Sequence, residues 1–121
     1  MTYIRYEKTR DMHRIRLKGH AGAAKKNEDI VCAACSILCY TMAQNAIDMK
    51  KSGIVDRAKS EIHDGYAAID ISAIDKKHEA IVQVVIDTVM RGFQLLAKNY
   101  PHFVQFVYKG EKENSNAVKC N

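Results

Sequence analysis

Two residue types that together can perform nucleophilic catalysis, a cysteine and a histidine, lie close together in this sequence. His20 belongs to a loop of small residues, and Cys32 follows twelve residues later, near the predicted start of a helix. The positive end of a helix dipole stabilises a thiolate, and a neighbouring imidazole can accept the thiol proton. We therefore predict a thiol nucleophile site, with Cys32 as the nucleophile and His20 as the general base.

The helix that carries Cys32 is predicted to begin after Asp29 and to end near residues 50–51. Asp29 is a favourable N-cap residue, and its carboxylate could accept the backbone N–H of Cys32 at the N3 position. Small or apolar residues then recur on one helix face, at Val31, Cys35, Leu38, Met42, Ala46 and Met49. Ser36 shares a helix face with Cys32, so it could hydrogen-bond at the site or pack there. Gly53 is the predicted residue that ends the helix.

Cys32 and Cys35 also form a C-x-x-C pair, a spacing that redox enzymes and metal sites use. A thioredoxin-like site would need a βαβ setting and a suitably placed cis-proline, but the single proline, Pro101, follows a helix. A metal site built from Cys32, Cys35 and His20 would lack a second pair of ligands. We therefore predict no metal and no cofactor, and we expect Cys35 and Cys39 to fill the core as small apolar residues.

The remaining elements must position this pair. Alternating apolar residues predict strands over 2–7, 12–18, 54–62, 67–72 and 102–108, and a longer pattern predicts a helix over 75–98. The order ββαββαβ predicts an α+β fold, a two-layer sandwich in which two helices pack on a mainly antiparallel sheet. His20 directly follows the second strand, so a rigid element should position it.

Length and composition indicate one soluble domain. With 121 residues, of which 47% are hydrophobic, the chain can bury a core without disulfides. We predict a single domain over 1–108 and a polar tail over 109–121, in which Cys120 is incidental. The charged N-terminus is unlike a secretory leader, and no apolar run reaches the length of a membrane span, so we expect a cytoplasmic protein without a membrane partner. The net charge of +5 could attract an acidic partner or ribosomal RNA, or it could be an ordinary solvated surface. Because no basic stripe is interleaved with aromatic residues, we expect that direct nucleic-acid binding is not required.

The second helix carries more apolar residues than one core face needs. One stripe contains Ile81, Val84, Val85, Thr88, Leu95 and Leu96, and an adjacent stripe contains Val82, Ile86, Val89 and Phe93. Together they cover roughly 200° of the helix, whereas a core face needs about 100°. We predict a homodimer that buries part of the stripe from Val82 to Phe93. Cover by a loop or strand of the same chain is the alternative.

The motifs Gly19-His20-Ala21 and Asp29-Ile30-Val31-Cys32-Ala33-Ala34, followed by Ser36, resemble those of the ribosomal-processing cysteine protease family, Prp. The resemblance implies a small bacterial endopeptidase, usually a homodimer. Such an enzyme removes a short N-terminal extension from large-subunit ribosomal protein twenty-seven, after a phenylalanine. It also implies Cys32 as nucleophile and His20 as base. The loop that contains Gly19, Ala21 and Gly22 could close over the substrate peptide.

The sequence departs from the family pattern at two positions. Asn27 stands where the family usually has glycine, and Cys35 stands where an apolar residue is common, which puts a second thiol close to the nucleophile. The alternative function is a non-enzymatic ribosome-assembly or interaction module, in which Cys32 and His20 are structural. Thiol reactivity distinguishes the two, because a buried structural cysteine resists mild alkylation.

Overall fold

The computed structural model describes residues 1–19 and 26–110, with the side chains described in 1–19 and 30–110. Within these ranges the elements follow the predicted order ββαββαβ. They are β1 (Thr2–Lys8), β2 (His13–Lys18), α1 (Lys26–Lys51), β3 (Val55–His63), β4 (Tyr66–Ala73), α2 (Lys76–Asn99) and β5 (Val104–Lys109). The predictions for His20, Ala21, Gly22, Cys120 and most of the tail concern residues outside the described part.

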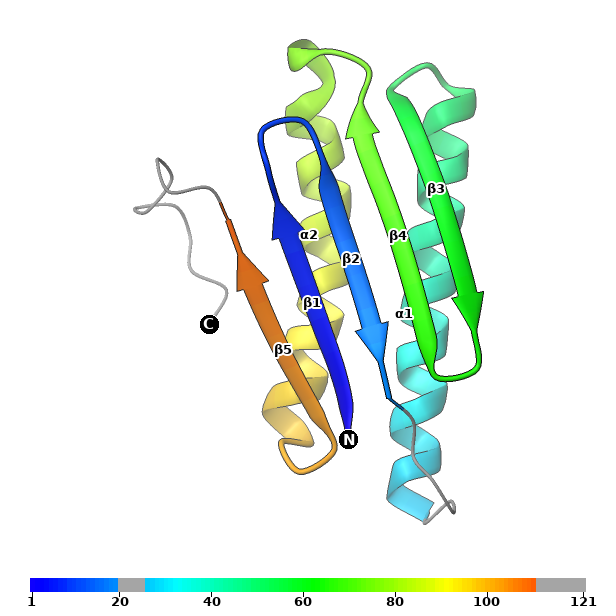
Figure 1. The fold of residues 1–121 in the computed structure, drawn as a ribbon, viewed down its shortest axis with the longest axis vertical. Coiled ribbons are helices and arrows are strands. Elements are labelled where there is room, and N and C mark those ends of the chain that lie inside the picture. The colour runs from blue at the N-terminus through cyan, green and yellow to red at the C-terminus, as the bar shows by residue number, and fades with distance from the viewer. Residues whose placement is uncertain (20–25, 111–121) are drawn as a thin grey trace.

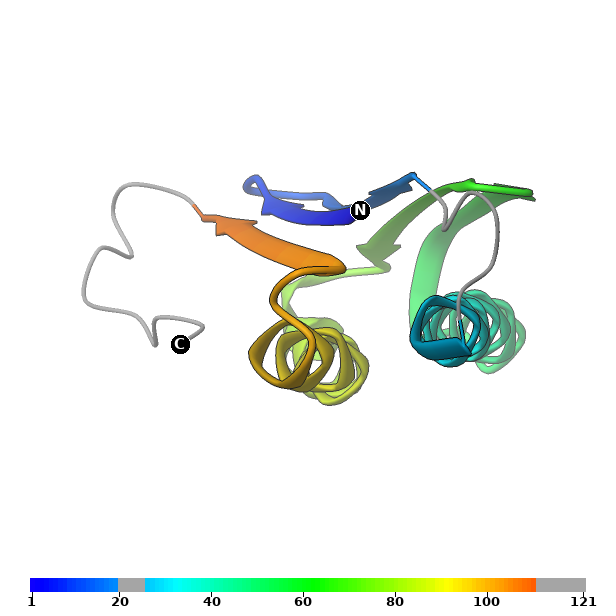
Figure 2. The same cartoon turned by 90° about the horizontal axis from the view of Figure 1, so that it is seen from below.

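The described strands form one mixed sheet in the order β3-β4-β2-β1-β5 (Figure 1). Three of the four strand pairs are antiparallel, and β1 pairs with β5 in parallel. Viewed along the strands, both helices lie on the same face of the sheet (Figure 2). This arrangement confirms the predicted two-layer α+β sandwich with a mainly antiparallel sheet.

The core lies between the sheet and the two helices. In the central strands, every second side chain points toward the helices, so Ile4, Ile15 and Ile69 are buried while their strand neighbours are more exposed. The stripe predicted on α1 faces them, with Val31, Cys35, Met42, Ala46 and Met49 buried and Leu38 packed at its edge. Cys39 is buried too, which confirms that Cys35 and Cys39 fill the core.

The start of α1 differs from the prediction. The helix begins at Lys26, three residues before Asp29, so Asp29 is its fourth residue and is not the N-cap. A capping residue such as aspartate can also occupy the first helical turn, where acidic Glu28 and Asp29 suit the positive end of the helix dipole. As a result Cys32 is the seventh residue of α1 and lies in the second helical turn, one turn further from the helix N-terminus than predicted.

The end of α1 confirms the prediction for Gly53, which adopts the left-handed conformation with φ +77°. Its N–H donates to the carbonyl of Lys50 at 3.1 Å, and the N–H of Ile54 donates to the carbonyl of Met49 at 2.9 Å. These two bonds are the Schellman pattern, which satisfies the last helix carbonyls and turns the chain toward β3.

The prediction for α2 is right about its bounds and wrong about which stripe is free. Asp75 caps the helix and accepts the backbone N–H of His78 at 3.0 Å. Val82, Ile86, Val89 and Phe93, the stripe expected at a dimer interface, are buried inside the single chain. The neighbouring stripe is the open one, and Val84 is 65% exposed. A sequence pattern shows two adjacent apolar stripes, but only the position of the sheet decides which one is covered.

Both helices pass a length and composition test for membrane spans. The most apolar 18-residue stretch has a mean hydropathy of 1.6 within Ile30–Lys51 and of 1.4 within Lys76–Asn99. The expectation that no apolar segment reaches such a length is therefore wrong by this criterion, because the test tolerates scattered charged residues. Core helices of soluble proteins pass the same test, and each of these helices buries one side against the sheet. The prediction of no membrane partner stays a prediction.

Candidate active site

Gly19 fixes the way in which the chain leaves β2. Its φ of +115° is a conformation that residues with a side chain rarely adopt, and a Cβ here would clash with the backbone carbonyl of Met1. Its N–H donates to the carbonyl of Gly65 at 3.0 Å. This hydrogen bond holds the end of β2 against the β3–β4 turn. Gly19, the residue directly before His20, is therefore a fixed point of the chain, which we call the anchor.

Cys32 lies opposite this anchor. It is partly exposed on the second turn of α1 and lines a small cavity of about 70 Å³. Gly19, Ser36 and residues of the β3–β4 turn line the same cavity. The structure thus brings together Cys32, Ser36 and Gly19, three residues singled out from the sequence, while the side chains of His20 and Asp29 lie outside the described part. Their catalytic roles stay predictions.

The buried thiols next to Cys32 have a different chemistry. Cys35 is 4% exposed and Cys39 is 2% exposed. Burial, with a smaller contribution from the charge of the neighbouring cysteine, raises the pKa of Cys35 to about 11 and that of Cys39 to about 12. Both are protonated at neutral pH. Of the three cysteines that the structure describes, Cys32 is therefore the accessible candidate nucleophile.

The sequence reasoning did not identify His63 as a site residue, because a single histidine far from Cys32 in sequence gives no local signal of a site. His63 lines the cavity beside Cys32. Its Nε2 lies 2.7 Å from a carboxylate oxygen of Glu61, and its ring stacks on Tyr66 with the ring centroids 6.3 Å apart. The sequence contained one indication. His63-Asp64-Gly65 includes Asp-Gly, which favours a hairpin turn, and a turn after β3 lies at the end of the sheet where β2 ends.

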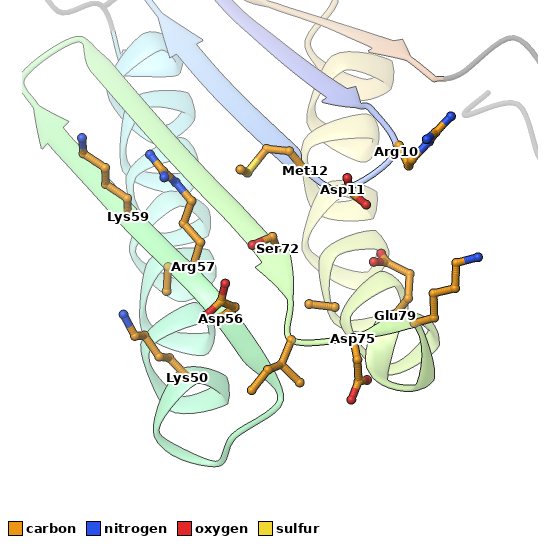
Figure 3. A pocket seen from close by; sticks show the side chains of 14 residues that line it. Arg10, Asp11, Met12, Lys50, Asp56, Arg57, Lys59, Ser72, Asp75 and Glu79 are labelled. Atoms are coloured by element: carbon orange, nitrogen blue, oxygen red, sulfur yellow. The ribbon is translucent and has the colours of Figure 1, made fainter.

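A second, larger cavity lies at the opposite end of the sheet. It has a volume of about 950 Å³. Figure 3 shows Lys50, Arg57 and Lys59 on the side of α1 and β3, and Asp75 and Glu79 at the start of α2. None of its described lining residues is a cysteine, a serine–histidine pair or another activated nucleophile. Its size therefore does not make it the candidate active site.

A buried hydrogen-bond network stands behind this second cavity. Gln83 Nε2 donates to the Tyr6 hydroxyl at 2.9 Å, and that hydroxyl lies 2.7 Å from His13 Nδ1. His13 Nε2 lies 2.5 Å from Glu79 Oε1. Since Gln83 occupies the acceptor side of the hydroxyl, Tyr6 donates to Nδ1 and a neutral His13 donates from Nε2 to Glu79. Burial lowers the pKa of His13 and so favours this neutral form, while Glu79 opposes the shift.

Within residues 1–19 and 30–110, whose side chains the structure describes, no donor set for a metal ion is visible. No group of three or more histidine, cysteine, aspartate or glutamate side chains is placed there to hold an ion. The C-x-x-C pair supplies two sulfurs, and a structural zinc site would need four ligands.

The protein has a two-layer α+β fold. A partly exposed thiol on its first helix faces a small cavity at the end of a strand. These features place it in the class of candidate thiol enzymes. The sequence model of the family described as cysteine protease Prp matches residues 1–105. The chain therefore belongs to the Prp family of cysteine proteases. This assignment confirms the resemblance inferred from the motifs and supports an enzyme over the alternative, a non-enzymatic module.

Solved structures show the same fold. SMU.848 from Streptococcus mutans is 27% identical, with a TM-score of 0.67 over 92% of this chain and 96% of that one. The ribosomal processing protease Prp from S. aureus, in complex with a covalently linked product peptide, is 19% identical, with a TM-score of 0.66 over 90% of this chain and 100% of that one. A substrate-peptide complex of the S. aureus protein is 17% identical over the same shares, also with a TM-score of 0.66. The comparison with curated proteins gives no match.

Proposed function

We propose that this cysteine protease removes a short N-terminal extension from the precursor of large-subunit ribosomal protein twenty-seven. Membership of the Prp family supports the proposal, and the S. aureus relative is a ribosomal processing protease bound to peptide. The observation that carries it is the position of Cys32, which faces a cavity that it shares with Gly19, the residue directly before His20.

In the proposed mechanism, Cys32 and His20 perform acyl transfer. The Cys32 thiolate attacks the peptide carbonyl, and the protonated His20 donates to the leaving amine. A thioester forms, and water then hydrolyses it. Because α1 begins at Lys26, the backbone N–H groups without a partner in the helix belong to its first turn. These groups, rather than the amide of Cys32, are the available donors for the oxyanion.

The cleavage is tested by incubating the protein with the extended ribosomal protein precursor and weighing the products. We expect a single cut that releases the N-terminal extension, after a phenylalanine and before a small residue. A precursor that stays intact, or is cut at many sites, contradicts the proposal. The mature ribosomal protein, which lacks the extension, is the control and should stay uncut.

The base is tested by limited labelling with iodoacetamide. Cys32 should label well before Cys35 and Cys39, because their pKa values of about 11 and 12 keep them protonated and burial shields them. The substitution His20→Ala should slow the labelling of Cys32, and His102→Ala, at an exposed residue, is the matched control. Equal labelling of Cys32 in the wild type and His20→Ala would show that the imidazole does not activate the thiol.

We further propose a cytoplasmic homodimer formed through the outer faces of the two helices. Large apolar side chains are exposed there, on α1 at Ile37, Tyr40 and Ile47 and on α2 at Ile81, Val84 and Leu95. Both helices lie in the same layer (Figure 2), so a second copy could cover both stripes. Sedimentation at low micromolar concentration should show a dimer, and Val84→Glu should give monomer. A wild-type monomer contradicts the proposal.

A further inference from the structure

Three thiols lie in succession along α1, and one of them is exposed. Cys32 is partly exposed, whereas Cys35 and Cys39 are buried, and all three line the same cavity of about 70 Å³. Residues three apart in a helix are surface neighbours, with Cβ atoms about 5–6 Å apart. Burial first, and the neighbouring Cys32 second, raise the pKa of Cys35, as expected for thiols one helical turn apart.

We propose that Cys32 and Cys35 form an oxidation site that closes into a disulfide within α1 and so protects and silences the thiol of Cys32. A disulfide needs Cβ atoms about 3.5–4.5 Å apart, so closure requires this helical turn to tighten by roughly 1–2 Å. The cavity beside the two side chains provides room for the sulfurs to rotate toward each other. Only the consequence for peptide cleavage rests on the proposed function.

The reaction with a peroxide balances without another reactant. The Cys32 thiolate attacks one oxygen of hydrogen peroxide, the O–O bond breaks, and Cys32 becomes a sulfenic acid while hydroxide leaves. The Cys35 sulfur then attacks the Cys32 sulfur, and the S–O bond breaks. The hydroxyl leaves as water with the proton of Cys35. Two thiols and one peroxide thus give one disulfide and two waters, and the peroxide accepts both electrons.

The order of these steps follows from burial. Peroxide reacts with exposed thiolates, so Cys32 is oxidised first and the protonated, buried Cys35 second. Burial is the larger cause of the raised pKa of Cys35 and does not depend on the state of Cys32, so Cys35 reacts in the second step only.

Cys39 is the natural comparison, because it is a third thiol on the same side of the helix. Seven residues of helix separate it from Cys32, which is about 10 Å along the axis and beyond the reach of a disulfide. Cys39 can approach Cys35, but both are buried and protonated, so neither of them reacts first with peroxide. The pair that closes is Cys32 with Cys35.

Because closure tightens a helical turn, the disulfide should be strained and easily reduced. Oxidation then inactivates the Cys32 thiol reversibly, because peroxide converts it to the disulfide and a dithiol reduces it back to the free thiol. Without Cys35, the sulfenic acid has no second thiol within reach among the residues that the structure describes, since Cys39 is too distant. Excess peroxide would then carry it to the sulfinic acid, which a dithiol does not reduce.

The experiment treats the full-length protein with excess hydrogen peroxide and reads intact mass, free thiols and cleavage of the precursor. In the wild type we expect the loss of two hydrogen atoms in mass and the loss of alkylation at both Cys32 and Cys35. We also expect full recovery of cleavage after a dithiol. In Cys35→Val, we expect the gain of two oxygen atoms at Cys32 and at least a roughly tenfold lower recovery of cleavage after the dithiol.

Cys39→Ala is the matched control and should behave as the wild type. A wild type that gains oxygen at Cys32 without losing two hydrogens, or a Cys35→Val variant that recovers fully, would overturn the proposal. Mass and thiol readouts need no substrate, so they separate the two proposals. A disulfide in a protein that never cleaves the precursor leaves the oxidation site standing and removes the proposed substrate.

Discussion

The two ends of the sheet contrast in size, charge and chemistry. At one end, Cys32 and Gly19 face a cavity of about 70 Å³ beside the β3–β4 turn. At the other end, a charged cavity of about 950 Å³ lies in front of the network that links His13 to Glu79. The larger cavity has the charges, and the smaller one has the accessible thiol. The proposed active site is therefore the smaller cavity, because it combines an accessible thiol with the hydrogen-bonded end of β2 at Gly19, whereas the larger cavity has only volume and charge to recommend it.

The sharpest test of this contrast is one substitution at each end. Cys32→Ala should reduce cleavage by about a thousandfold or more, because it removes the proposed nucleophile. Glu79→Gln, at the far end, should cleave at the wild-type rate, since its side chain keeps an oxygen that can accept from His13. Initial rates on the precursor measure both, and a circular dichroism melt checks that Cys32→Ala is folded. Wild-type cleavage by a folded Cys32→Ala would move the active site elsewhere.

The anchor at Gly19 can be compared with a second glycine that has a similar backbone. Gly19→Ala should lower the free energy of unfolding by about 1–3 kcal/mol, because it combines a positive φ with a clash against the carbonyl of Met1. Gly53→Ala is the matched control, since its φ is also positive but its added Cβ meets no atom within 4 Å.

Both glycine variants are measured by denaturant unfolding and by cleavage. Gly19→Ala should lose more stability than Gly53→Ala, and it alone should lose cleavage under conditions in which both are folded, because it displaces the segment that begins with His20. Equal losses of stability, or unchanged cleavage by Gly19→Ala, would mean that Gly19 does not act as the anchor of the site.

At the far end, the network should affect stability rather than catalysis. His13→Phe leaves the Tyr6 hydroxyl without its acceptor and Glu79 without its donor, so the free energy of unfolding should fall by about 1–3 kcal/mol. His102→Phe is the matched control, because His102 is exposed. Under conditions in which His13→Phe is fully folded, it should cleave at the wild-type rate. Slower cleavage there would show that the network at this end of the sheet affects catalysis at the other end.

The same residue makes a prediction about pH. Burial lowers the pKa of His13 in the folded state, so below about pH 6.5 the unfolded chain binds a proton that the folded chain resists. This contribution to stability is present above that pH and is lost as the pH falls toward the lowered folded-state pKa. Denaturant midpoints from about pH 7 to pH 5 should therefore fall more steeply in the wild type than in His13→Phe. Parallel curves would show that His13 does not titrate differently on unfolding.

The smallest expected effect concerns His63, at the Cys32 end. His63→Ala should raise the KM for the precursor a few-fold, because the imidazole lines the cavity beside Cys32. Its stability should not change, since the His63 side chain is 63% exposed. Lys59→Ala, on the same strand but at the other cavity, is the control. An unchanged KM would mean that the substrate does not reach the β3–β4 turn.

Local patterns alone determined the element order, both hairpins, the ends of α2 and the glycine that ends α1. These features depend on alternation, caps and turn residues that act within a few positions of the chain. The same local signals nominated Cys32. Local signals also led to the wrong prediction that Asp29 is the N-cap of α1. A good capping residue can also occupy the first turn of a helix, and nothing local decides between the two positions.

Tertiary structure decided what depends on residues distant in sequence. The sheet chose which stripe of α2 is buried, brought His63 to the cavity of Cys32, and placed His13 against Glu79, 66 positions away. Each outcome depends on strand order and register, because those set which side chains meet across the sheet. A one-dimensional pattern records that a residue is apolar or titratable, but burial and partners arise only when the strands pair and the helices cover them.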